Sequence, residues 1–178
     1  MFIIVAVFII AACGSKQGKS AGSQTSSEPP GTGIHAAAFL GDLDAIQQHI
    51  KVGSNLNEKD EYGSSPLTIA ATFDKTEVAL ALIEAGADIN ITNNDGATVL
   101  HTAAFFCRKE IVGALLKNGA DKSVKNNFGS TALESVSGPF NEVRGIYDEF
   151  SKALGPLGFK LDYKYIESTR PIIAEMLQ

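Results

Sequence analysis

The segment Gly63-Ser-Ser-Pro-Leu-Thr-Ile-Ala-Ala-Thr-Phe-Asp74 decides how this chain folds, because its pattern returns along the sequence. The same pattern begins again as Gly96-Ala-Thr-Val-Leu-His-Thr-Ala-Ala-Phe-Phe106, and Gly129 opens another copy after the same interval. A fixed period of about 33 residues is typical of folds built by stacking one small unit on the next. A single unit cannot bury its apolar face alone, so we expect the copies to form one continuous stack.

Each copy carries the residue types of two short helices. Ser65 and Thr98 can cap the first helix with their hydroxyl groups, and Pro66 suits the first helical position because it lacks an N–H. The second helix has one apolar face at helical spacing. We expect the glycines that follow it to end each second helix in the left-handed conformation; they are Gly53, Gly86 and Gly119.

These residues resemble the ankyrin repeat, whose pattern is a glycine, Thr-Pro-Leu-His, a paired Ala-Ala, a Leu-Leu helix end and Gly-Ala-Asp. The resemblance covers residues 32–137 and includes an earlier copy that begins at Ile34-His-Ala-Ala-Ala38. It implies an all-α solenoid of about four helix-turn-helix units. The chain departs from the family pattern at Cys107, where Gly is usual, and in the last copy, which drifts at Gly138-Pro139.

Residues 138–178 are expected to form a degenerate last repeat and a helical cap. Apolar residues at helical spacing predict a helix over residues 143–154, and glycines and a proline break it at 155–158. We expect Ser168 or Thr169 to cap a final helix, with Pro171 in its first turn. The segment either closes the open end of the stack, which we favour, or is an appendage for a specific partner.

The N-terminal residues 1–13 have the composition of a secretory signal. Met1 to Ala12 is apolar but too short to span a bilayer, which takes about 20 residues. The run Ile10-Ala11-Ala12-Cys13 resembles a bacterial lipobox, which implies that Cys13 is lipidated and becomes the new N-terminus. No Lys or Arg precedes the apolar run, and a leader with a chance cysteine is the alternative.

The composition of residues 14–31, rich in Ser, Gly, Lys and Gln, predicts a disordered tether between this anchor and the repeats. The resemblance to lipoproteins places the chain at the bacterial envelope, facing the periplasm or the cell surface. Gly14 after the cysteine would permit transfer to an outer membrane, although the choice of membrane stays open.

The charge and the polar residues give no indication of catalysis, of a metal or of a cofactor. The net charge is −5, which argues against a nucleic-acid partner. No Ser/His/Asp or paired-carboxylate constellation emerges, and the chain is not expected to be an enzyme. His35 and His101 occupy the same repeat position, where the family resemblance implies hydrogen bonds between neighbouring loops.

Cys107 is the one residue that keeps a redox function open. A free cysteine is most often a small buried residue, whereas a redox cysteine needs an exposed, electropositive setting. Arg108 and Lys109 follow Cys107 directly, so exposure of the thiol would decide between the two interpretations.

The recognition surface is expected at the loop tips and at the first helices, which line a groove in ankyrin stacks. The repeat register gives the following candidate contacts with a protein partner: Tyr62, Phe73, Asn94, Asp95, Phe105, Phe106, Asn127 and Phe128. We expect about half of the helix aromatics to be exposed, because the others pack between helices. The function that follows is a monomeric, non-catalytic module that binds a protein. Two concrete roles fit: an immunity protein against a secreted toxin or phospholipase, and an accessory factor for a periplasmic oxidative-stress enzyme.

Overall fold

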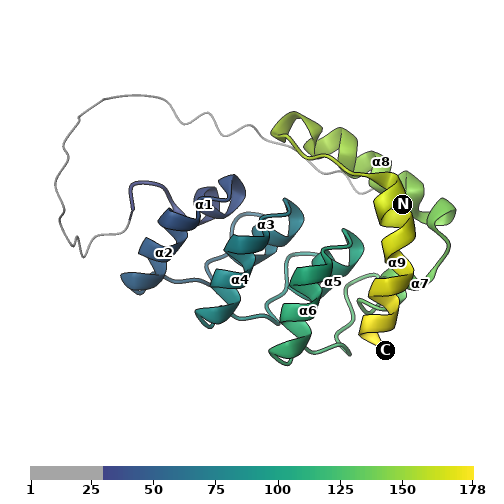
Figure 1. The fold of residues 1–178 in the computed structure, drawn as a ribbon, viewed down its shortest axis with the longest axis horizontal. Helices are drawn as coiled ribbons and strands as arrows, with labels where there is room; N and C mark the ends of the chain where they lie inside the picture. Colours follow the sequence, from purple (N-terminus) through teal and green to yellow (C-terminus); the bar gives the residue numbers. More distant parts are fainter. Residues whose placement is uncertain (1–29) are drawn as a thin grey trace.

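The structure, a computed structural model, describes residues 30–178, which fold as a row of helix pairs closed by a helical cap (Figure 1). Every secondary-structure element in this part of the chain is helical, so the expected all-α solenoid is confirmed. The helices of the stack are α1 (Ile34–Leu40), α2 (Leu43–Lys51), α3 (Pro66–Thr72), α4 (Thr76–Glu84), α5 (Val99–Phe105) and α6 (Lys109–Lys117).

The caps and helix ends that the sequence predicts for the stack are present. The hydroxyl of Ser65 accepts a hydrogen bond from the Thr68 amide at 3.2 Å, and Thr98 does the same for the His101 amide at 3.4 Å. Pro66 is the first residue of α3. The glycines after the second helices are left-handed, with φ between +73° and +83°; they are Gly53, Gly86 and Gly119.

Small residues let the first helices pack closely. Each contributes two adjacent alanines that are completely buried: Ala37 and Ala38, Ala70 and Ala71, and Ala103 and Ala104. Without longer side chains between them, α1, α3 and α5 approach each other along the row. The second helices add larger buried residues to the same core: Ile46, Leu82 and Leu115.

The cap consists of α7 (Glu134–Ser137), α8 (Phe140–Leu154), the 3₁₀ turn η1 (Gly155–Leu157) and α9 (Tyr163–Leu177). The expected helix and the break after it are confirmed. The predicted start of the last helix is wrong: α9 begins at Tyr163, where Asp162 caps it by accepting the Tyr165 amide at 3.1 Å, and Pro171 lies inside the helix. The buried residues Ile166, Arg170, Ile173 and Leu177 recur every three or four positions, which is the spacing of one helix through the proline.

Two parts of the cap contact different parts of the stack. Helix α9 packs against α5, α6 and α7 at the end of the row (Figure 1). The segment of residues 140–160, which we call the strap, turns back along the row instead. Its Phe150 contacts Phe106 with ring centroids 5.2 Å apart, and its Phe159 reaches Phe73 of the preceding repeat at 5.8 Å. The strap therefore ties the cap to more than one repeat.

Candidate functional site

The loop tips form the most exposed row of side chains that the sequence predicts for binding. Three hairpin-like turns precede α3, α5 and α7, and we call residues 60–64, 93–97 and 126–130 the three tips. Tyr62 on the first tip is 44% exposed and Phe128 on the third is 59% exposed. Asn94, Asp95 and Asn127 are exposed as well, so five of the eight predicted contact residues lie on this row.

Each tip is shaped internally by one polar side chain. Asp60 accepts hydrogen bonds from the amides of Tyr62 and Ser64, at 2.9 and 2.8 Å. Asn93 and Asn126 occupy the equivalent positions of the next two tips and make the equivalent pair of bonds. The three tips therefore have the same fixed shape.

Neighbouring tips are also bonded to one another. The side-chain amide of Asn94 donates to the carbonyl of Glu61 at 3.0 Å, and that of Asn127 donates to the carbonyl of Asn94 at 3.0 Å. One side-chain N–H of each of these two predicted contact residues is thus already used to hold the row together. A partner would contact the remaining exposed atoms of these two asparagines. The main apolar contacts of the row would be Tyr62 and Phe128.

The repeated histidine, in α1 and α5, bonds its helix to the loop that precedes the first helix of the next repeat. The Nε2 of His35 contacts the Glu58 carbonyl at 2.9 Å, and that of His101 contacts the Ser130 carbonyl at 3.0 Å. Burial lowers the pKa of His101 below its usual value and outweighs the opposing effect of the Ser130 hydrogen bond. The structural role expected for this histidine is confirmed.

The aromatic residues of the first helices are covered by the chain itself. Phe106 is only 4% exposed, so the prediction that it contacts a partner is wrong. Phe105 stacks on Tyr147 of the strap with ring centroids 4.4 Å apart, and Phe73 lies between Phe39 and Phe159. Phe105 and Phe73 are consequently half-buried. The repeat register alone could not reveal this cover, because the strap is outside the repeats.

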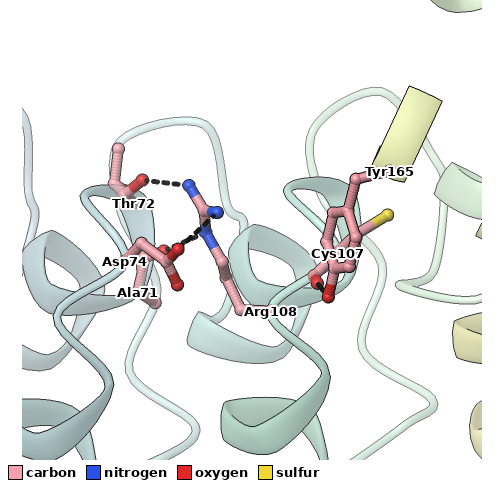
Figure 2. A network of polar contacts seen from close by, with 6 residues as sticks. All are labelled: Ala71, Thr72, Asp74, Cys107, Arg108 and Tyr165. Carbon is pink, nitrogen blue, oxygen red and sulfur yellow. Dashed lines mark hydrogen bonds and ion pairs between the residues drawn. The ribbon is translucent and has the colours of Figure 1, made fainter. Parts of the chain in front are cut away.

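A polar network that the sequence analysis missed lies at the other end of the first helices (Figure 2). The guanidinium of Arg108 pairs with Asp74 of the preceding repeat at 3.1 Å, and it donates to the carbonyls of Ala71 and Thr72 at 3.3 and 3.1 Å. These carbonyls belong to the last turn of α3, where a cation is stabilised by the helix dipole. Arg108 thereby bonds its own repeat to the one before it.

The turns that carry this network share an unusual backbone conformation. Gly41, Asp74 and Cys107 occupy the same position in successive repeats and all have positive φ, of 77°, 59° and 56°. A residue with a side chain is strained in this region, and such strain persists only where surrounding contacts hold it. Asp74 is held by Arg108, and the Cys107 carbonyl accepts from the Tyr165 hydroxyl at 3.3 Å. The equal spacing of these three positions could have located the network in the sequence.

Cys107 is buried, with 1% of its surface exposed. Its sulfur lies 3.7 Å from the Ile166 carbonyl of α9. Burial raises the pKa of the thiol to about 11, and the nearby Arg170 and Arg108 offset only part of this effect. A neutral, covered thiol lacks the exposed thiolate that redox chemistry needs, which argues against the redox alternative.

Residues 30–178 contain neither a metal-binding cluster nor a membrane-spanning helix. Among residues 30–178, no group of three or more His, Cys, Asp or Glu side chains could hold a metal ion. No helix in this range is both long and apolar enough to cross a membrane. The predicted lipidation site, Cys13, and the predicted tether up to residue 29 lie outside the described residues.

Known proteins support the repeat assignment. The human protein named DNA-binding protein RFXANK is 40% identical over 52 residues, which are 29% of this chain and 20% of the human one. This chain thus spans about a fifth of the length of that relative. The family model described as "Ankyrin repeats (3 copies)" matches residues 34–126, more than half of the chain. With this match and the stacked helix pairs, the chain belongs to the ankyrin-repeat family.

Proposed function

We propose that this chain is a monomeric, non-catalytic module of the bacterial envelope that binds and modulates a partner protein through its row of loop tips. Ankyrin repeats are protein-interaction modules, so the general kind of function follows from the family. The observation that carries the specific proposal is the pair of exposed aromatic side chains, Tyr62 and Phe128, on tips bonded into one rigid row.

Rigidity favours binding at this row. Asn94 and Asn127 hold neighbouring tips in register, so little conformational freedom is lost when a partner docks. Aromatic side chains on a rigid surface are common anchors of protein interfaces. DNA is not the partner that we propose, because the chain carries a net charge of −5 and would repel phosphates.

Phe128→Ala is the direct test of the tip row. Once a partner has been captured with the full chain, titration calorimetry should show affinity lower by roughly 2 kcal/mol, because an exposed aromatic anchor is lost. Ile172→Ala, at an exposed apolar residue that belongs to α9 and to none of the tips, is the matched control and should bind as the unmodified chain does. Phe128→Ala should fold with stability changed by no more than about 0.5 kcal/mol. Equal affinity of the Phe128→Ala and Ile172→Ala variants would contradict binding at the tips.

Cys13→Ser tests the anchor separately. If Cys13 is lipidated, the substitution should shift the protein from the membrane fraction to the soluble fraction or stop its processing. Mass spectrometry of the protein from a bacterial host reports the lipid, and fractionation reports the location. Unchanged mass and unchanged membrane association would contradict the anchor, while the binding proposal would stand or fall by the Phe128 experiment.

A further inference from the structure

A pocket of about 350 Å³ lies between the strap and the turns that follow the first helices of the first three repeats, and we call it the edge pocket. It is at the C-terminal ends of α1 and α3, whereas the tips precede the N-terminal ends of the first helices. It is therefore separate from the surface proposed above and does not depend on that proposal. Its volume is near the lower end of the usual range for small-ligand sites, about 300–1,000 Å³.

Aromatic rings form one wall of the edge pocket. Phe39 and Phe73 pack edge to face with centroids 4.7 Å apart, and Phe159 of the strap packs edge to face on Phe73 at 5.8 Å. The rings come from two repeats and the strap, and each holds its neighbour in place. This wall is therefore a preformed apolar surface.

Two exposed leucines stand beside this wall. Leu40, at the end of α1, is 62% exposed, and Leu157, in η1, is 45% exposed. Both line the edge pocket, although they are far apart in the sequence. Exposed apolar side chains that gather at one concavity are typical of a binding site.

The charges at the pocket have the opposite sign to the chain as a whole. Lys75, Arg108 and Lys160 line it, against one carboxylate, that of Asp74, which Arg108 already engages at 3.1 Å. Within residues 30–178, neither Lys75 nor Lys160 is in an ion pair. Two ammonium groups next to an apolar wall, on a chain of net charge −5, would attract a ligand that combines an anion with an apolar group.

We propose that the edge pocket binds a carboxylate that carries an apolar group. The carboxylate would pair with Lys75 and Lys160, and the apolar group would lie on the phenylalanine wall between Leu40 and Leu157. A monocarboxylate would pair with the two available ammonium groups, and a volume of about 350 Å³ suits an apolar part of one ring or one side chain. This chemistry occurs both in a small aryl-alkanoic acid and in the last residue of a polypeptide.

Titration of the full ¹⁵N-labelled chain with defined probes tests the proposal by NMR. The first probe is 4-phenylbutyrate, with 4-phenylbutanol as its uncharged control. The second is acetyl-Ala-Ala-Leu with a free carboxylate, with the same peptide as a C-terminal amide. The carboxylates should shift the backbone amides of Lys75, Gly158, Phe159 and Lys160 saturably, and added salt should weaken the binding.

Two lysine variants connect the binding to the pocket. Lys75→Met and Lys160→Met keep the apolar part of the side chain and remove the charge, and each should weaken carboxylate binding by about tenfold. Lys117→Met, an exposed lysine at the end of α6 outside the pocket, is the matched control and should bind normally.

The two probes distinguish the two sources of the carboxylate. Binding of phenylbutyrate alone would identify a small acid as the ligand class, and binding of the free peptide would identify a chain terminus. Equal binding of charged and uncharged probes, or equal effects of Lys160→Met and Lys117→Met, would overturn the proposal. So would the absence of shifts at these four amides at millimolar probe concentration.

Discussion

Gly96→Val is expected to lower the free energy of unfolding by about 3 kcal/mol, measured by urea denaturation. Gly96 has a φ of +70°, where a β-branched residue is strongly strained. A Cβ at this position would also lie 2.6 Å from the Oδ1 of Asn127 and 3.2 Å from its backbone nitrogen. The substitution therefore strains the backbone and displaces the side chain that joins the second tip to the third.

Gly129→Val separates these two effects. Gly129 has nearly the same backbone, with a φ of +79°, but a Cβ there would meet nothing within 4 Å. In this variant only backbone strain should lower the free energy of unfolding, by about 1–2 kcal/mol. If both variants lost the same amount, contact between tips would contribute nothing at Gly96. If Gly96→Val unfolded like the unmodified chain, the assignment of the glycine to the turn would be wrong.

The regular repeat period explains why so much of the stack could be predicted. The turn, the N-cap and the helix end recur at fixed offsets. The roles of Ser65 and Thr98 as N-caps and of Gly86 as a helix end are therefore each supported by the neighbouring copies. Local chemistry and stacking agree at these positions, and the structure confirms the caps and the left-handed glycines. The predictions depended on repetition rather than on single residues.

The cap offered no such repetition. Pro171 was expected in the first turn of the last helix, because proline is favoured at helix starts. Helix α9 instead continues through it, since Ile166 and Ile173 on either side are both buried on the face toward the stack. Tertiary packing decided where this helix begins, and a single sequence does not show which surface is available for packing.

The candidate site could likewise be predicted only where it belongs to the repeat. The tips belong to the repeat, so Tyr62 and Phe128 were found by register and are exposed. Phe105 was also placed correctly as the last residue of α5, and Phe106 follows it as the C-cap, but the exposure of both depends on a strap that lies much further along the chain. The edge pocket was missed for the same reason, because part of its wall comes from the strap.

The strap is joined to the stack by an unusual buried network. Arg170 is buried, and its guanidinium donates to the Tyr147 hydroxyl at 2.9 Å and to the carbonyls of Ser135 and Gly138. Its Nε has no hydrogen-bond partner among residues 30–178. The Tyr147 hydroxyl in turn donates to the Phe105 carbonyl at 2.6 Å. Tyr147 thus connects α8, α9 and the last complete repeat.

Tyr147→Ala is expected to cost about 3–5 kcal/mol of unfolding free energy, measured by urea denaturation, because it removes a fully buried ring that stacks on Phe105. It also leaves Arg170 and the Phe105 carbonyl without one hydrogen-bond partner each. Tyr147→Phe keeps the ring and should cost only about 1–3 kcal/mol, which measures the hydroxyl alone. Ile146→Ala, at the exposed neighbouring position of the same helix, should change stability by no more than about 0.5 kcal/mol.

The Tyr147 series also decides what the C-terminal segment is. A cap that closes the stack unfolds together with it, so the loss should appear in one cooperative transition shared by the repeats and the strap. An appendage kept only for a partner would unfold separately, and Tyr147→Ala would then leave the main transition unchanged. Because the network reaches Phe105 within α5, we expect a single transition at a lower urea concentration. Removal of the ring should then expose Phe105, on which it stacks.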